Sequence, residues 1–176
     1  MSKYSDSASL PFERTGLWRS AFRVRSDNQR RAITAFYYNQ LRNLRDKART
    51  LVDRIRTDMP YLTVHDITHV DALWEIGSTI AGPSYSLTPA EGYVFGAAVL
   101  LYDAAMCLAA FPGGLPEIAE TDEWKDAVVM LFAEAHKAQP KPGEIRNPPR
   151  EIIERAVPIV LRRLHARRAE ELPRTK

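Results

Sequence analysis

TPAEGYVFGAAVLLYDAAMCLAA, residues 88–110, predicts a helix that the rest of the chain must enclose. Thr88 is a good helix N-cap residue, Pro89 suits the first helical position, and Glu91 can cap back onto the backbone of Thr88. From residue 92 onward nearly every side of the helix is apolar. Because a helix without a polar face belongs in the centre of a fold, we expect the chain to be built around this one.

Apolar residues recur at helical spacing along the whole sequence, and no strand-like alternation extends beyond a few residues. The predicted helices span residues 26–57, 65–80, 88–110, 121–138 and 149–172. The proline-rich stretch AQPKPGEIRNPP is expected to be a loop, and Pro158 should kink the last helix. We therefore expect an all-α bundle of about five main helices at residues 26–172, preceded by an N-terminal extension at residues 1–25.

The composition fits one soluble domain. The chain has 176 residues, of which 45% are hydrophobic, enough for a core, and it has no long apolar run or signal peptide. Its single cysteine, Cys107, excludes an internal disulfide framework and lies in an apolar run, where we expect a small core residue rather than a nucleophile. A cytoplasmic location is expected.

The net charge of +3 is unevenly distributed. Residues 1–60 contain 13 Lys and Arg against 6 Asp and Glu, and the rest of the chain contains 12 against 16. The first helix is therefore basic, and Arg42, Arg45 and Arg49 could contact nucleic acid. Base stacking would need exposed aromatic rings, whereas Phe36 and the two tyrosines after it are expected on the buried side of this helix.

The stretch LTVHDITHVDAL, residues 62–73, holds two of the four histidines. His65 and His69 share a helix face if the helix already includes residue 65, and this spacing occurs in metal sites. Alternatively, Asp66 caps the helix and the imidazoles bond to backbone or solvent. Asp103, on the apolar helix, adds to the first interpretation, because a buried carboxylate costs several kcal/mol unless it is paired or bound to a metal.

A helix carrying a histidine, followed by an apolar helix that ends in Tyr-Asp, resembles the all-helical HD superfamily of metal-dependent phosphohydrolases. YLTVHDITHVDALWEIGSTIAGPSYSLTPAEGYVFGAAVLLYDAAMCLAAFPGG is similar to the N-terminal HD region of large bacterial proteins that join an HD domain to a GHKL-type ATP-binding module. LRRLHARRAEEL is similar to a later histidine-containing helix of the same branch. The resemblance covers about residues 58–172 and implies a divalent transition metal such as Mn, Fe, Ni or Zn.

The resemblance assigns the family's site residue by residue, with residues 65–110 forming the metal-site helices. His69 matches the first metal-binding histidine, and Tyr102-Asp103 occupies the place of the His-Asp pair. His165 matches an additional histidine of the branch, and His65 is a further candidate. The metal-ligand candidates are therefore His69, Asp103, His165 and His65, with Asp103 also the candidate catalytic residue. The family's final Asp has no counterpart before the sequence ends.

Tyr102 is a poor substitute for a metal-binding imidazole, because a phenol with a pKa near ~10 keeps its proton at neutral pH. It could instead hydrogen-bond Asp103 or His69 in a neutral polar cluster, while His165 lies either on a solvated basic face or inward. We expect a degenerate HD-type module, a binding or regulatory part of a larger HD/ATPase-like protein that self-associates or docks to further domains. The alternatives are a metal-dependent phosphohydrolase acting on a nucleotide or nucleic acid, and a nucleic-acid-binding helical protein.

Overall fold

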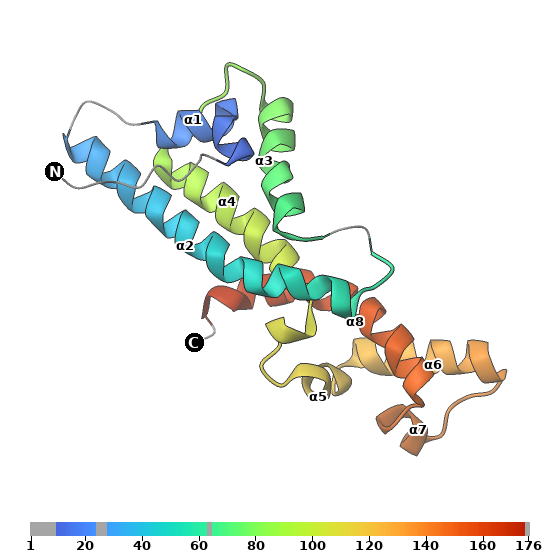
Figure 1. The fold of residues 1–176 in the computed structure, drawn as a ribbon. Coiled ribbons are helices and arrows are strands. Elements are labelled where there is room, and N and C mark those ends of the chain that lie inside the picture. The colour runs from blue at the N-terminus through green and yellow to red at the C-terminus, as the bar shows by residue number, and fades with distance from the viewer. Residues whose placement is uncertain (1–9, 24–27, 63–64, 175–176) are drawn as a thin grey trace. The chain divides into compact units, whose positions relative to one another are not determined.

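The computed structural model describes residues 10–23, 28–62 and 65–174 (Figure 1). These residues form α-helices and short 3-10 helices and no strand, which confirms the all-α prediction. The α-helices are α1 (Gly16–Phe22), α2 (Asn28–Asp58), α3 (Ile67–Ala81), α4 (Pro89–Ala104), α5 (Gly114–Ala119), α6 (Asp122–His136), α7 (Pro142–Arg146) and α8 (Arg150–Glu171). Five of them, α2, α3, α4, α6 and α8, have 15 residues or more. No helix of this described part is long and apolar enough to cross a membrane.

Two boundaries differ from those predicted. α4 ends at Ala104 rather than near Ala110, and the backbone N–H of Leu108 in the following turn donates to Asp58 Oδ2 at 2.8 Å. The expected loop AQPKPGEIRNPP contains the short helix α7, because Glu144 caps the backbone N–H of Lys141 at 2.7 Å just before a proline at the first helical position. Residues 1–9 and 24–25 of the predicted extension and residues 26–27 of the predicted long helix lie outside the described residues.

The chain forms two compact units. The first unit comprises residues 1–46 and 68–99, and the second comprises residues 47–67 and 100–176. Helices α2 and α4 each contribute residues to both units. Each unit has its own core and is described by itself.

An aromatic cluster around Trp18 forms the core of the first unit. The Trp18 ring centroid lies 4.9 Å from Phe12, 4.5 Å from Phe22 and 4.9 Å from Trp74 on α3. α1 begins where the Thr15 side chain accepts a hydrogen bond from the Trp18 N–H. The segment that the sequence places in an N-terminal extension therefore supplies core side chains to this unit.

Two glycines let other helices of the first unit approach α4 closely. A Cβ atom at Gly92 would lie 2.5 Å from the Cβ of Ala21, and one at Gly96 would lie 2.7 Å from the Trp74 ring. The two glycines are four residues apart, so they share one face of α4. α1 and α3 pack against this face.

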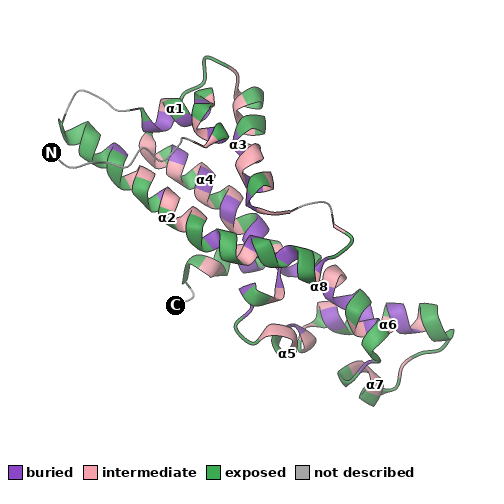
Figure 2. Ribbon diagram, in the orientation of Figure 1, coloured by how far each residue is buried: buried purple, intermediate pink, exposed green. Residues whose placement is uncertain are grey.

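The opposite side of α4 is exposed, so the expectation that the rest of the chain encloses this helix is wrong for one face. Val94 is 65% exposed, and Figure 2 shows buried and exposed residues alternating along the helix. Phe36 on α2 is 57% exposed, so its expected burial is also wrong. An apolar composition does not by itself require burial, because much of any protein surface is apolar.

Ion pairs attach α2 to its neighbours within the first unit. Arg42 Nη1 lies 2.7 Å from Glu13 Oε1, and Arg45 Nε donates to Asp71 Oδ1 on α3 at 2.8 Å. Hydrogen bonding to the Asp71 carboxylate raises the pKa of Arg45 above its usual value. Two of the arginines that make α2 basic are thus engaged inside the protein.

The second unit is organised around α8, along which α6 packs (Figure 1). Thr121 caps the start of α6, because its side chain accepts a hydrogen bond from the Trp124 N–H at 3.2 Å. α8 continues through Pro158. The largest core side chains of this unit that are exposed by less than 2% are Trp124, Ile55, Ile118, Ile152, Leu161, Val52, Val128, Val160 and Cys107.

Cys107 is fully buried, which confirms its prediction as a core residue, and burial raises the pKa of its thiol to about 11. We expect a thiol reagent at pH 8 to label Cys107 in urea but not in the native protein. The thiol loses its proton at a higher pH in the folded state than in the unfolded state. The free energy of unfolding is therefore expected to fall by about 2 kcal/mol as the pH rises from 9 to 11. Chemical denaturation of Cys107→Ala at the same pH values should show a smaller fall in the free energy of unfolding. A fall equal to that of the wild type would contradict the assignment of this pH dependence to Cys107.

Candidate functional site

Tyr102 and Asp103, which the resemblance assigns to the place of the His-Asp pair, lie in the last turn of α4 and differ in exposure. Asp103 is buried, with 5% of its surface exposed, as the apolar sequence around it suggested. Tyr102 is 51% exposed. The side chains of consecutive helical residues point about 100° apart. The Asp103 carboxyl therefore faces the core, and the Tyr102 phenol faces the surface.

The structure brings Tyr102 together with His165. Their ring centroids are 4.5 Å apart and the rings are nearly perpendicular, at 81°. Such edge-to-face pairs contribute about 0.5–1.5 kcal/mol beyond the area they bury. His165 is half-buried on α8, between the surface and inward positions that the sequence left open. Two positions 63 residues apart in the sequence thus form one aromatic pair.

A backbone carbonyl holds the imidazole of His165 in one orientation. His165 Nδ1 lies 2.6 Å from the carbonyl oxygen of Arg162, one turn earlier on α8. Because a carbonyl oxygen only accepts hydrogen bonds, Nδ1 carries the proton, and in the neutral ring Nε2 is the acceptor. Nε2 is therefore the atom with which His165 can bind a donor.

The other two candidate histidines belong to different units. His69 is half-buried on α3 in the first unit. His65 is half-buried in the second unit and, with Asp66, lines a cavity of about 420 Å³. The rest of this cavity is lined by Val52, Asp53, Ile55, Arg56, Met59, Pro60 and Leu62. The His65-Asp66 dipeptide thus faces a mixed polar and apolar space.

The side chains of the described residues do not gather into a metal-binding set. Among them, no group of three or more His, Cys, Asp or Glu side chains is arranged to hold a metal ion. A transition metal in a site of this kind needs several such donors converging on one point. Tyr102, in the place of a donor imidazole, packs on His165 instead. Within each unit the described residues thus offer too few converging donors for the metal that the resemblance implies, and the assignment of His69, Asp103, His165 and His65 as ligands stays a prediction.

Arg168 holds the turn that follows Asp103. Its guanidinium is buried, with Nε donating to the Ala110 carbonyl at 2.6 Å and Nη1 bonding Glu171 at 2.9 Å. The guanidinium carbon also lies 5.4 Å from the ring centroid of Phe111. The prediction of a solvated basic face on this helix did not identify Arg168 as a buried residue. The spacing of Arg168 from the buried Leu161 and Leu164 was the signal that could have identified it.

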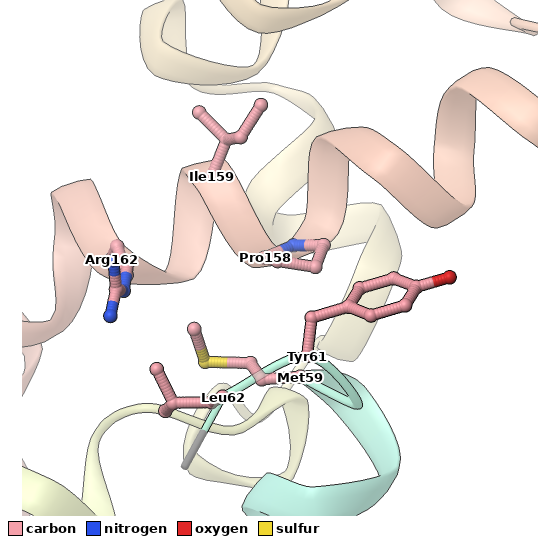
Figure 3. A pocket seen from close by; sticks show the side chains of 6 residues that line it. All are labelled: Met59, Tyr61, Leu62, Pro158, Ile159 and Arg162. Atoms are coloured by element: carbon pink, nitrogen blue, oxygen red, sulfur yellow. The ribbon is translucent and has the colours of Figure 1, made fainter.

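A second cavity of the second unit was not predicted. It has a volume of about 230 Å³ and lies between α8 and the segment that follows α2 (Figure 3). Its lining residues are Met59, Tyr61, Leu62, Pro158, Ile159 and Arg162. Arg162 is also the residue whose carbonyl oxygen orients His165, so this cavity and the Tyr102–His165 pair involve successive turns of α8.

Comparison with known proteins agrees with the HD-like resemblance. The HD-CE family matches residues 59–176, close to the range over which the sequence resembles HD domains. No curated protein and no solved structure matches this chain. Because the match covers more than half of the sequence, the chain belongs to the HD-CE family.

Proposed function

We propose that this chain is an HD-type module that binds or regulates, with little or no hydrolysis of its own. The observation that carries the proposal is the edge-to-face packing of Tyr102 on His165. At the place that the resemblance gives to the family's histidine, the chain has a phenol, and imidazole is the side chain that suits such metals. Its contact with His165 links α4 to α8 and gives both rings a structural role.

The other features of the second unit are consistent with a module whose former metal site has become structural. Asp103 is buried at the end of α4, and the turn after it is fastened by Arg168. These contacts stabilise the arrangement of α4 and α8 without requiring a reaction.

The proposal includes docking to further domains of a larger HD/ATPase-like protein. Ile76 and Ile80 lie four residues apart on α3, so they share one face of the helix. They are 52% and 81% exposed. Exposed apolar side chains that share one helix face are a feature of protein-protein contacts, and this pair supports the proposal.

The nucleic-acid alternative has less support. Arg42 and Arg45, on which it rested, are paired with Glu13 and Asp71 inside the first unit. Arg49 lies 3.7 Å from Asp53 on the same helix. Neutralising these arginines would remove internal ion pairs, so a loss of nucleic-acid binding in such a variant would not identify a binding surface.

The test is metal content by elemental mass spectrometry, on protein purified without chelator or immobilised-metal resin. We expect no stoichiometric Mn, Fe, Ni or Zn in the wild type and a gain of metal in Tyr102→His, because that change restores the imidazole at the family's position. Tyr102→Phe is the matched control: it keeps an aromatic ring against His165, adds no donor and should gain no metal.

Stoichiometric metal in the wild type, together with nucleotide hydrolysis that is lost in Asp103→Ala, would overturn the proposal in favour of a metal-dependent phosphohydrolase. Failure of Tyr102→His to gain metal would show that more than one donor is missing. That result would leave a binding role without a former metal pocket at this position.

A further inference from the structure

The cavity beside Arg162 has one charged wall and otherwise apolar ones. Met59, Leu62, Pro158 and Ile159 supply hydrocarbon, and Tyr61 supplies an aromatic ring. In Figure 3, Pro158 and the guanidinium of Arg162 lie on the side of α8 turned toward Met59 and Leu62. An apolar cavity with one oriented polar group is the usual form of a small-molecule site.

Arg162 has a charge that no carboxylate of the described residues pairs with. Elsewhere on α8, Arg150 pairs with Glu154, Arg155 with Glu134 and Arg168 with Glu171. Among the ion pairs of the described residues, none involves Arg162, and the residues three and four positions from it along α8 include no acid. A planar guanidinium in this state is suited to bidentate binding of a carboxylate.

Tyr61 forms an aromatic wall that is almost completely uncovered. Its side chain is 97% exposed, although it lines the cavity, and in Figure 3 its ring stands next to Pro158. A bound molecule would cover this ring and bury apolar surface on both partners, which is favourable by roughly 25 cal/mol per Å². The exposed ring is thus part of an apolar surface that a ligand can complete.

We propose that this cavity binds a small carboxylate with an apolar acyl or aryl body, the carboxylate on Arg162 and the body between Tyr61, Leu62 and Pro158. A cavity of about 230 Å³ accommodates a body of roughly eight non-hydrogen atoms, given about 30 Å³ for each water in the liquid. One cation suits a single carboxylate and not a polyphosphate. The site is separate from the Tyr102–His165 pair, so this inference does not depend on whether the module hydrolyses anything.

Calorimetric titration of the full chain with octanoate, hydrocinnamate and octanol tests the proposal. Both carboxylates should bind saturably at millimolar concentration, and octanol, which has a similar chain without the charge, at least about tenfold more weakly. Arg162→Gln should weaken octanoate binding by about tenfold, since it removes the charge-assisted bonds. Tyr61→Ala should weaken all three by several-fold, and its fold should be intact because the removed ring is exposed.

Arg163→Gln is the matched control, because Arg163 is an exposed neighbour on α8 that does not line the cavity. It should bind octanoate as the wild type does. Absence of saturable binding of either carboxylate overturns the proposal. Equal binding of octanol and octanoate, or equal losses in Arg162→Gln and Arg163→Gln, also overturns it, because either result removes the specific role of Arg162.

Discussion

Replacing Trp18 with alanine is expected to lower the free energy of unfolding by about 4 kcal/mol, within the range of Trp-to-Ala changes in protein cores. Trp18 is 4% exposed and its ring contacts Phe12, Phe22 and Trp74. Removing the indole leaves a cavity that three rings border. Domains are commonly stable by only about 5–15 kcal/mol, so the first unit would lose a large part of its stability.

Urea denaturation followed by far-UV circular dichroism measures this loss. Trp18→Phe keeps part of the aromatic volume and should lose about half as much. Arg19→Ala changes the next residue, which is exposed, and should stay within about 0.5 kcal/mol of the wild type. A Trp18→Ala protein as stable as the wild type would mean that the segment from Pro11 to Phe22 is not part of the core.

Local signals in the sequence predicted the helices that depend on local chemistry. At the start of α4, Glu91 accepts from the Thr88 N–H at 2.8 Å and its own N–H donates to Thr88 Oγ1 at 3.3 Å. The hydrogen bonds that the Glu91 carboxylate accepts from the Thr88 N–H and the Thr88 hydroxyl lower the pKa of Glu91. The long period of apolar residues likewise placed the end of α2 within one residue. Caps and periodicity are visible in sequence because their partners are at most a few residues away.

Contacts between distant segments could not be predicted in this way. α1 is only seven residues long, too short for a clear period, so the core position of Trp18 was not visible. Phe36 belongs to an amphipathic pattern, yet it lies outside the buried stripe that contains Leu41 and Ala48. The face that a helix buries depends on where the partner helices pack, and sequence periodicity does not specify that.

In the candidate site, too, features that depend on neighbouring residues could be predicted, and contacts between distant segments could not. The burial of Asp103 follows from its apolar neighbours, and it was predicted. The pairing of Tyr102 with His165 and the cavity at Arg162 depend on how α8 packs against segments about 60 to 100 residues earlier in the chain. Family resemblance pointed to His165, but it did not identify the phenol as its partner.

Replacing Arg168 with alanine is expected to lower the free energy of unfolding by about 3 kcal/mol, because a buried carbonyl loses its partner and a hydrogen bond from a charged group is lost. Its Nε–Ala110 bond and its contact with Phe111 hold the turn between Asp103 and α5 on α8. Arg168→Lys keeps the charge but not the planar guanidinium, so it should recover only part of the loss. The ion pair with Glu171 adds little, because that carboxylate is half exposed.

Thermal and urea denaturation of three variants separates these contributions. Glu171→Ala should change the free energy of unfolding by less than about 0.5 kcal/mol, and Arg167→Ala, which alters an exposed neighbour on α8, should do the same. If Arg168→Ala were no more destabilising than Arg167→Ala, the buried bond to Ala110 would not stabilise the fold. A large loss confined to Arg168 would show that this arginine fixes the end of α4, and with it the position of Asp103, from a helix about 60 residues later in the chain.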